Sequence, residues 1–133
     1  MILTCGLSPA WQHILVADGL SPGEVNRASE IYWCASGKVL NAAIALAHLG
    51  GEGRVVSLLG GARGSDIKCE FEGWDIETSW VECASPTRVC TTIIDSATGS
   101  VTELVENAGA LTASELESFR RACREEAGAP GLA

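Results

Sequence analysis

Residues 35–51, ASGKVLNAAIALAHLGG, constrain the fold of this chain more than any other segment. A Gly-Lys turn is followed three residues later by Asn41, and the chain then becomes a nearly continuous apolar helix that two glycines end. Polar groups are costly at the start of a buried helix unless something binds them. A helix N-terminus offers free N–H groups and the positive end of its dipole, which suit an anion. The segment therefore predicts a substrate site on an α/β scaffold.

The acidic balance of the chain limits its partners. The net charge is −8 over 133 residues, of which 47% are apolar, so a globular protein with one core is expected. Nucleic acids and anionic membranes attract clustered Lys and Arg, so we expect neither as a partner. A phosphorylated small molecule remains compatible, because one or two well-placed cations suffice to bind it.

The cysteines suggest an intracellular protein. Six of them lie at positions 5, 34, 69, 83, 90 and 123, without C-x-x-C spacing and without a histidine at metal-ligand spacing. We expect reduced, mostly buried thiols and no metal site. The first residues lack the basic region and cleavage site of a signal peptide. No apolar run reaches the ~18 residues of a membrane span, so a cytoplasmic location is expected.

The order of strands and helices predicts two sheets. Short apolar runs bounded by turn residues predict strands at 2–5, 14–17, 24–34, 54–59, 80–83, 88–95 and 101–105. Helices are expected in the opening segment, over residues 65–72 and from Thr112, which forms a capping box with Glu115. The β-α-β alternation favours a parallel sheet. The second, third, sixth and seventh strands do not fit it, so they predict a second, small sheet of hairpins.

Gly37 and Lys38 do not belong to a P-loop. Tyr32 stands where that motif needs its first glycine, and Val39 stands where it needs a hydroxyl. A solvated Lys beside a turn glycine is the structural alternative. The position of Asn41 at the start of an apolar helix favours substrate binding instead.

Three further positions are candidates for ligand contact, and two of them allow a second interpretation. Arg88 opens a β-branched strand, where it is either a bidentate phosphate ligand or a charge that protects a sheet edge. Glu106 ends a strand near a glycine, as part of a ligand site or as a polar loop rim. Trp11 is expected in the loop after the first strand, where it is the tryptophan best placed to face a ligand.

Several motifs occur together in an order typical of one family. These are SPA at residues 8–10, PGEVNRA at 22–28, SGKVLNAA at 36–43, LLGG at 58–61, PTR at 86–88 and TELVEN at 102–107. As a set they resemble the N-terminal half of a ribokinase-like, PfkB-family carbohydrate kinase. The similarity is greatest to the branch of 1-phosphofructokinase and tagatose-6-phosphate kinase. The resemblance implies a three-layer α/β/α core with a small β-sheet lid, whose strands lie at about 13–34 and 88–106 and often form dimer contacts.

The resemblance also implies a reaction and a set of ligands. The family transfers the γ-phosphoryl group of ATP to a sugar hydroxyl. By similarity, the residues that bind the sugar or its phosphate are Gln12, Gly37, Lys38, Asn41, Arg88 and Glu106. Gln12 stands where the family has an Asp, and Val39 stands where it has a second glycine. These departures leave the identity of the sugar open.

The family's catalytic Asp, anion hole and most of its ATP site lie in a later half of the domain. Residues 1–133 are therefore expected to form a partial kinase domain that holds no catalytic residue, no metal ligand and no evident site for ATP or Mg²⁺. We expect no kinase activity from this chain alone, and association through an unpaired apolar sheet edge. A non-catalytic sugar-phosphate-binding or dimerisation module is the alternative, and a generic α/β nucleotide binder is a third interpretation.

Overall fold

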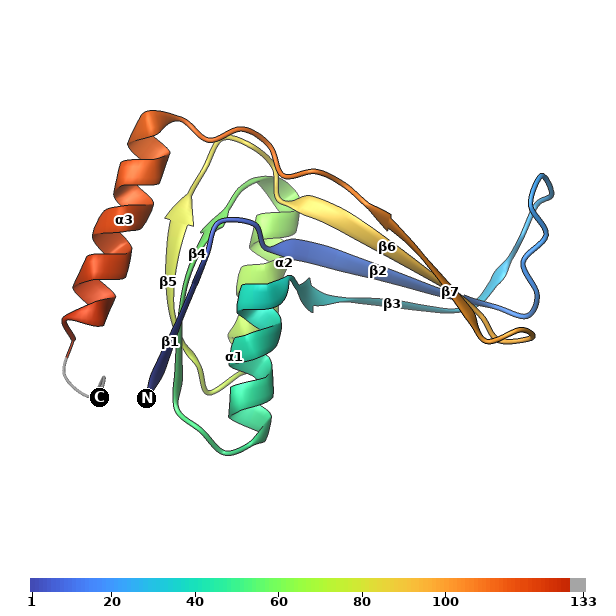
Figure 1. The fold of residues 1–133 in the computed structure, drawn as a ribbon, viewed down its shortest axis with the longest axis horizontal. Coiled ribbons are helices and arrows are strands. Elements are labelled where there is room, and N and C mark those ends of the chain that lie inside the picture. Colours follow the sequence, from blue (N-terminus) through green and yellow to red (C-terminus); the bar gives the residue numbers. More distant parts are fainter. Residues whose placement is uncertain (130–133) are drawn as a thin grey trace.

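The computed structural model describes residues 1–129, so the last residues of the tail lie outside the described part (Figure 1). The elements are β1 (Ile2–Gly6), β2 (Ala10–Ala17), β3 (Ala28–Ser36), α1 (Lys38–His48), β4 (Gly53–Leu59), α2 (Gly61–Phe71), β5 (Glu77–Glu82), β6 (Arg88–Asp95), β7 (Ser100–Val105) and α3 (Ala113–Ala127). They form a parallel sheet of order β1-β4-β5 and a second sheet of order β3-β2-β6-β7, here called the lid.

Strand β4 is buried along its whole length and separates two apolar clusters. Val55 and Leu59 pack against α1 and α2 in the first cluster. Val56 and Leu58 pack against α3 in the second. Because successive side chains of a strand point to opposite faces, the sheet is covered on both sides, as Figure 1 shows. The three-layer arrangement expected from the sequence is therefore present.

Helix α3 begins with the predicted capping box. The Thr112 hydroxyl accepts a hydrogen bond from the Glu115 N–H, and the Glu115 carboxylate accepts one from the Thr112 N–H at 2.7 Å. The same carboxylate accepts a 2.6 Å bond from the Ala84 N–H in the loop after β5. These backbone bonds lower the pKa of Glu115. The cap therefore joins α3 to the connection that leads into the lid.

The lid extends away from the parallel sheet (Figure 1), and hydrogen bonds join its strands at the far end. Its central pair, β2 and β6, is parallel, and each has an antiparallel outer neighbour. The second sheet is thus confirmed, although the parallel central pair means that it is not built of hairpins alone. At the tip, the Asp95 carboxylate accepts hydrogen bonds from the N–H groups of Gly19, Leu20 and Ala97.

Several element boundaries differ from the sequence-based expectation, among them the start of β5, which lies at Glu77 rather than residue 80. Strand β2 begins at Ala10 rather than residue 14, because it pairs with β3 and β6 from that residue onward. Strand β3 begins only at Ala28, since the Asn26 side chain bonds the backbone of Ser21 and holds a turn. Helix α2 begins at Gly61 rather than residue 65, because Gly64 donates to the Gly60 carbonyl.

The cysteines are free, but the expectation that most are buried was wrong. Only Cys90 is buried, while Cys5 and Cys69 are exposed and the other three are half-buried. Cys5 is exposed because β1 is an outer strand of the parallel sheet. Within the described residues, no helix is long and apolar enough to cross a membrane.

Candidate functional site

A hollow of about 570 Å³ opens at the carboxyl end of β1. It is lined by Thr4, Cys5, Gly6, Leu7, Ser8, Lys38, Val39, Ala42 and Arg88, and is called the cationic hollow below. Ligands of α/β proteins commonly bind beyond the carboxyl ends of parallel strands. The fold brings Lys38 of α1 and Arg88 of β6 to this position, although they are far apart in sequence.

Gly37 allows α1 to begin against the chain that leaves β1. Its φ is +99°, a conformation that glycine adopts without steric cost. A Cβ atom there would lie 3.1 Å from the Pro9 Cα and 3.2 Å from the Ser8 carbonyl oxygen. Both contacts are with backbone, which cannot easily move aside. The glycine therefore sets the close approach that places Lys38 beside Ser8.

The N-terminus of α1 is open to a ligand. Gly37, at the N-cap position, provides no side-chain hydrogen bond, and the first turn contains no acidic residue. The first N–H groups of a helix lack partners within the helix, and they carry the positive end of its dipole. Together with the exposed Lys38 ammonium, this end of α1 can bind an anion.

Arg88 is held by backbone carbonyl groups. Its guanidinium donates to the carbonyl oxygens of Pro9 at 3.4 Å, Glu106 at 3.2 Å and Ser8 at 3.4 Å. Strand β6 lies inside the lid sheet, so the interpretation of Arg88 as an edge charge was wrong. Within residues 1–129, neither Lys38 nor Arg88 forms a salt bridge. Both positive charges remain for a ligand.

Glu106 supports Arg88 without lining the cationic hollow. Its carboxylate accepts a 2.8 Å hydrogen bond from the Val89 N–H, and its own N–H donates to the Val89 carbonyl at 3.3 Å. These bonds extend the pairing of β6 with β7 by one residue. They fix the Glu106 carbonyl that accepts from Arg88.

Gln12 belongs to a polar row that crosses the lid. Its amide donates to the Thr92 hydroxyl at 2.6 Å, and that hydroxyl donates to the Glu103 carboxylate at 3.5 Å. The row joins β2, β6 and β7. Gln12 is therefore engaged within the lid and is not part of the lining of the cationic hollow.

Asn41 and Lys38 line different hollows, although they are neighbours on α1. Asn41 lines a second hollow, of about 360 Å³, with Cys34, Ala35, Ile44, Ala45, His48, Glu70 and Trp74. The Glu70 carboxylate there accepts a 2.7 Å bond from the Ala35 N–H. Burial, followed by the charge of Glu70, raises the pKa of Cys34, so this thiol stays protonated at neutral pH. The six predicted site residues are thus not gathered in one hollow.

The prediction for Trp11 was wrong, and some lining residues were missed. Trp11 lies in β2, is 9% exposed and packs in the cluster under α1 and α2, so it is a core residue. Thr4 and Ser8 flank the end of β1 and line the cationic hollow. Their position beside the strand end was the only sequence signal that could have indicated them.

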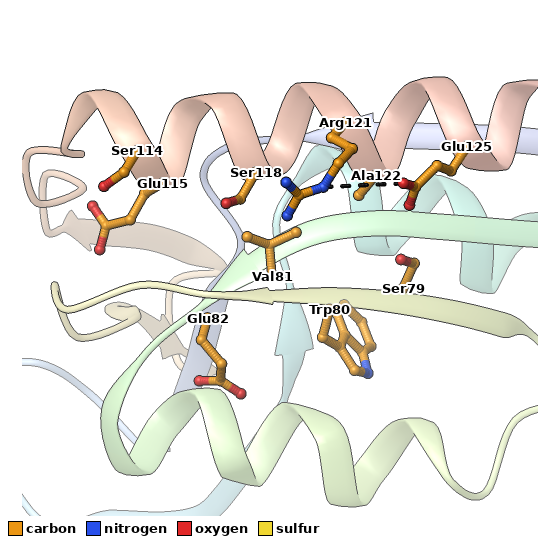
Figure 2. Close-up of a pocket in the computed structure, with 10 residues that line it drawn as sticks. All are labelled: Ser79, Trp80, Val81, Glu82, Ser114, Glu115, Ser118, Arg121, Ala122 and Glu125. Atoms are coloured by element: carbon orange, nitrogen blue, oxygen red, sulfur yellow. Dashed lines mark ion pairs between the residues drawn. The ribbon is translucent and has the colours of Figure 1, made fainter.

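Another open hollow, of about 410 Å³, lies between β5 and α3 (Figure 2). Arg121, the one cation among the described residues of its lining, lies 4.0 Å from Glu125, and Figure 2 shows the guanidinium directed toward that carboxylate. Glu115 is occupied by the helix cap and by Ala84. Because its cation is already paired, this hollow suits an anion less well than the cationic hollow.

The described residues show no fit for a metal ion. Residues 1–129 contain no group of three or more His, Cys, Asp or Glu side chains that could hold one. The lining of the cationic hollow includes no carboxylate. Mg²⁺ takes oxygen ligands, usually including carboxylates, so this hollow is not suited to a magnesium-nucleotide complex.

The family model described as pfkB family carbohydrate kinase matches residues 4–127. The chain belongs to this family. A curated relative, tagatose-6-phosphate kinase of Staphylococcus epidermidis, is 31% identical over 120 residues, which are 90% of this chain and 38% of the relative. The pfkB chain thus spans less than half the length of that relative.

Solved structures share the fold of this chain. The phosphofructokinase-2 from Escherichia coli, in complex with fructose-6-phosphate, has a TM-score of 0.88 at 24% identity. The match covers 93% of this chain and 41% of that one. A Thermotoga maritima protein named as a possible 1-phosphofructokinase has a TM-score of 0.83 at 25% identity, with coverages of 90% and 39%. The ribokinase-like α/β fold with a lid, expected from the sequence, is confirmed.

Proposed function

We propose that this chain binds a sugar phosphate in the cationic hollow, as part of ATP-dependent sugar-phosphate phosphorylation by a pfkB-type kinase. The observation that carries the proposal is that Lys38 and Arg88 meet beside an uncapped helix N-terminus without acidic partners. A phosphate group matches all three donors. The Arg88 fork can bind two oxygens, Lys38 supplies a point charge, and the helix supplies N–H groups.

The sugar ring is proposed to extend beyond the hollow. Gln12, Asn41 and Glu106 carry hydrogen-bonding groups but lie outside its lining. A role for them in binding sugar hydroxyls therefore requires the ring to reach past α1 toward the lid. Gly37 contributes shape, because a side chain there would meet Pro9 and Ser8.

We propose that these residues bind the substrate but do not transfer the phosphoryl group unaided. The lining of the cationic hollow includes no Asp, Glu or His that could accept the proton of the attacking hydroxyl. A general base is worth about 10²- to 10⁴-fold in rate. The free cysteines support a cytoplasmic setting for this chemistry.

Ligand binding by charge-deletion variants tests the proposal. We expect fructose 6-phosphate or tagatose 6-phosphate to raise the melting temperature of the wild-type chain. The Arg88→Ala and Lys38→Ala variants should each bind at least about tenfold more weakly, because each loses a charged partner of the phosphate. Titration calorimetry measures the affinities. Arg121→Ala is the matched control, since it removes a paired cation outside the hollow.

The outcomes separate the alternatives. Equal binding by the wild type and both variants would show that the cationic hollow is not the phosphate site. Binding of ATP without binding of sugar phosphate would favour a generic nucleotide binder. Sugar-phosphate binding without turnover in the presence of Mg²⁺ and ATP is the expected result, whereas measurable transfer would overturn the proposal that the chain is inactive alone.

We also propose that two copies of the chain associate through one face of the lid. Register pairing places Ile31 directly beside Leu15, and Leu15 directly beside Ile93. Paired residues point to the same face of a sheet, so these side chains form an apolar row. Ile31 is 57% exposed, and Trp33 and Leu104 on the same face are also exposed. Exposed contiguous apolar surface is typical of interaction sites.

A charge placed on either face of the lid tests this association. Ile31→Glu is expected to weaken self-association at least about tenfold, because a carboxylate would have to be buried in the apolar row. Val101→Glu is the control, since Val101 is 60% exposed on the opposite face. Sedimentation velocity measures the self-association of the wild type and of both variants. A monomeric wild type, or equal effects of the two substitutions, would contradict the proposed interface.

A further inference from the structure

Two cysteines lie on the side of the parallel sheet that α3 covers. Cys5 pairs in register with Val56 of β4, and Val56 belongs to the apolar cluster under α3. Side chains that pair across neighbouring strands point to the same face, so Cys5 points toward α3. Leu3, two residues earlier on β1, packs against this cluster, as does Cys123 of α3. Both thiols therefore lie between the same strand and the same helix.

The electrostatic environment of Cys5 includes Cys123. The pKa of Cys5 is raised to about 11 by burial first, and then by the neighbouring Cys123 thiol. Cys5 is nevertheless exposed, because β1 is an outer strand, and Cys123 is half-buried. A small oxidant in solution can therefore reach the pair. Cys5 also belongs to the strand whose carboxyl end forms the cationic hollow.

We propose that Cys5 and Cys123 form a redox pair, which a small-molecule disulfide such as glutathione disulfide converts into an intramolecular disulfide joining β1 to α3. The Cys123 thiolate attacks one sulfur of glutathione disulfide and releases one glutathione thiolate. The Cys5 thiolate then attacks the Cys123 sulfur of the mixed disulfide and releases the second. The two protons of the protein thiols pass to the two glutathione molecules, which take up the two electrons.

The order of attack follows from the environment of Cys5. Because its thiol stays protonated at neutral pH, it is a poor initial nucleophile. Once Cys123 carries glutathione, Cys5 is already beside the sulfur that it must attack. This high local concentration favours closure over attack by a second glutathione.

The bond would change the molecule in two measurable ways. It would close a loop from residue 5 to residue 123, which restricts the unfolded chain more than the native one. It would also fix α3 to the strand whose end forms the cationic hollow. Neither effect depends on which ligand that hollow binds.

Oxidation of the full chain tests the pair. The protein is incubated with glutathione disulfide, remaining thiols are alkylated, and a non-reducing tryptic digest is analysed by mass spectrometry. The expected product links the peptide of residues 1–27 to that of residues 122–124, with the loss of two hydrogens. We expect the melting temperature to rise by about 10 °C and to return after treatment with dithiothreitol.

Matched variants separate this pair from the other thiols. Cys5→Ser and Cys123→Ser should abolish the linked peptide and the rise in melting temperature. Cys83→Ser should keep both, although Cys83 packs on the same cluster. In guanidinium chloride the selectivity should vanish, because six thiols then pair at random and Cys5–Cys123 is about one pair in fifteen. A dominant link elsewhere, a stable glutathione adduct without closure, or no linked peptide in the native protein would overturn the proposal.

Discussion

The Gly60→Ala variant is expected to lose about 3 kcal/mol of unfolding free energy, at the upper end of overpacking effects. A Cβ atom at this position would overlap the carbonyl oxygens of Ser85 and Cys83 and would approach the Cys83 sulfur within 3.1 Å. Two of these atoms belong to the backbone, so no side-chain rotation relieves the overlap. The backbone of residues 83–85 would have to move away from the end of β4.

The same displacement should reach the candidate site. The Gly60 N–H donates to the Thr87 hydroxyl at 3.1 Å, and the Gly60 carbonyl accepts from the Thr87 N–H at 2.8 Å. Thr87 immediately precedes Arg88, so these bonds set where the guanidinium enters the cationic hollow. We therefore expect Gly60→Ala to weaken sugar-phosphate binding as well as stability.

Urea unfolding at equilibrium measures the loss, with Gly73→Ala as the control. A Cβ at Gly73 would meet only the Glu70 carbonyl, at an ordinary contact distance of 3.4 Å. Its free energy of unfolding should change by less than about 0.5 kcal/mol. If the free energy of unfolding of Gly60→Ala lies within about 1 kcal/mol of the wild-type value, then residues 83–85 do not pack tightly around Gly60.

Elements with local signals were predicted well from the sequence. Strand β6 has the predicted bounds because a β-branched run lies between turn residues, and the capping box at Thr112 was found because its residues are three apart. Strand β2 was placed too late, since only distant partners on β3 and β6 extend it to Ala10. Distant pairing leaves no local signal, so the misplacement of Trp11 followed from it.

The candidate site was predicted residue by residue but not as an arrangement. Lys38 and Arg88 were each selected for their local setting, and the fold brings them together in one hollow. Asn41 was grouped with Lys38 because they are close in sequence. Three residues correspond to about 300° around a helix, which leaves the two side chains only about 60° apart, yet each lines a different hollow. Which hollow each side chain lines depends on tertiary packing that spacing alone does not specify.

Arg54 should be the most important charged residue for the attachment of α3. It is a buried residue at the start of β4, where its guanidinium pairs with Glu77 of β5 and, at 2.9 Å, with Glu126 of α3. Among residues 1–129, its buried Nε atom has no hydrogen-bond partner, which makes the site costly to maintain. The ion pairs therefore join the last turn of α3 to both strands beneath it.

Arg54→Met is expected to reduce the unfolding free energy by about 2 kcal/mol, below the 3–5 kcal/mol typical of fully buried pairs. The smaller value is expected because the side chain of Glu77 is 59% exposed and can regain water, whereas that of Glu126, at 26%, remains half-buried without its partner. Adding Glu126→Leu should restore at least half of the loss, since no half-buried charge then remains without a partner. Equilibrium unfolding of the single and double variants measures both effects.

Arg121→Met on the same helix is the matched control. The Arg121–Glu125 pair is 4.0 Å apart and both side chains are more than 60% exposed, at 67% and 68%. Such surface pairs contribute about 0–1 kcal/mol, so this variant should unfold almost as the wild type does. If Arg54→Met costs no more than Arg121→Met, then α3 is held by apolar packing around Phe119 alone. If the double variant is less stable than Arg54→Met, then Glu126 stabilises α3 independently of Arg54.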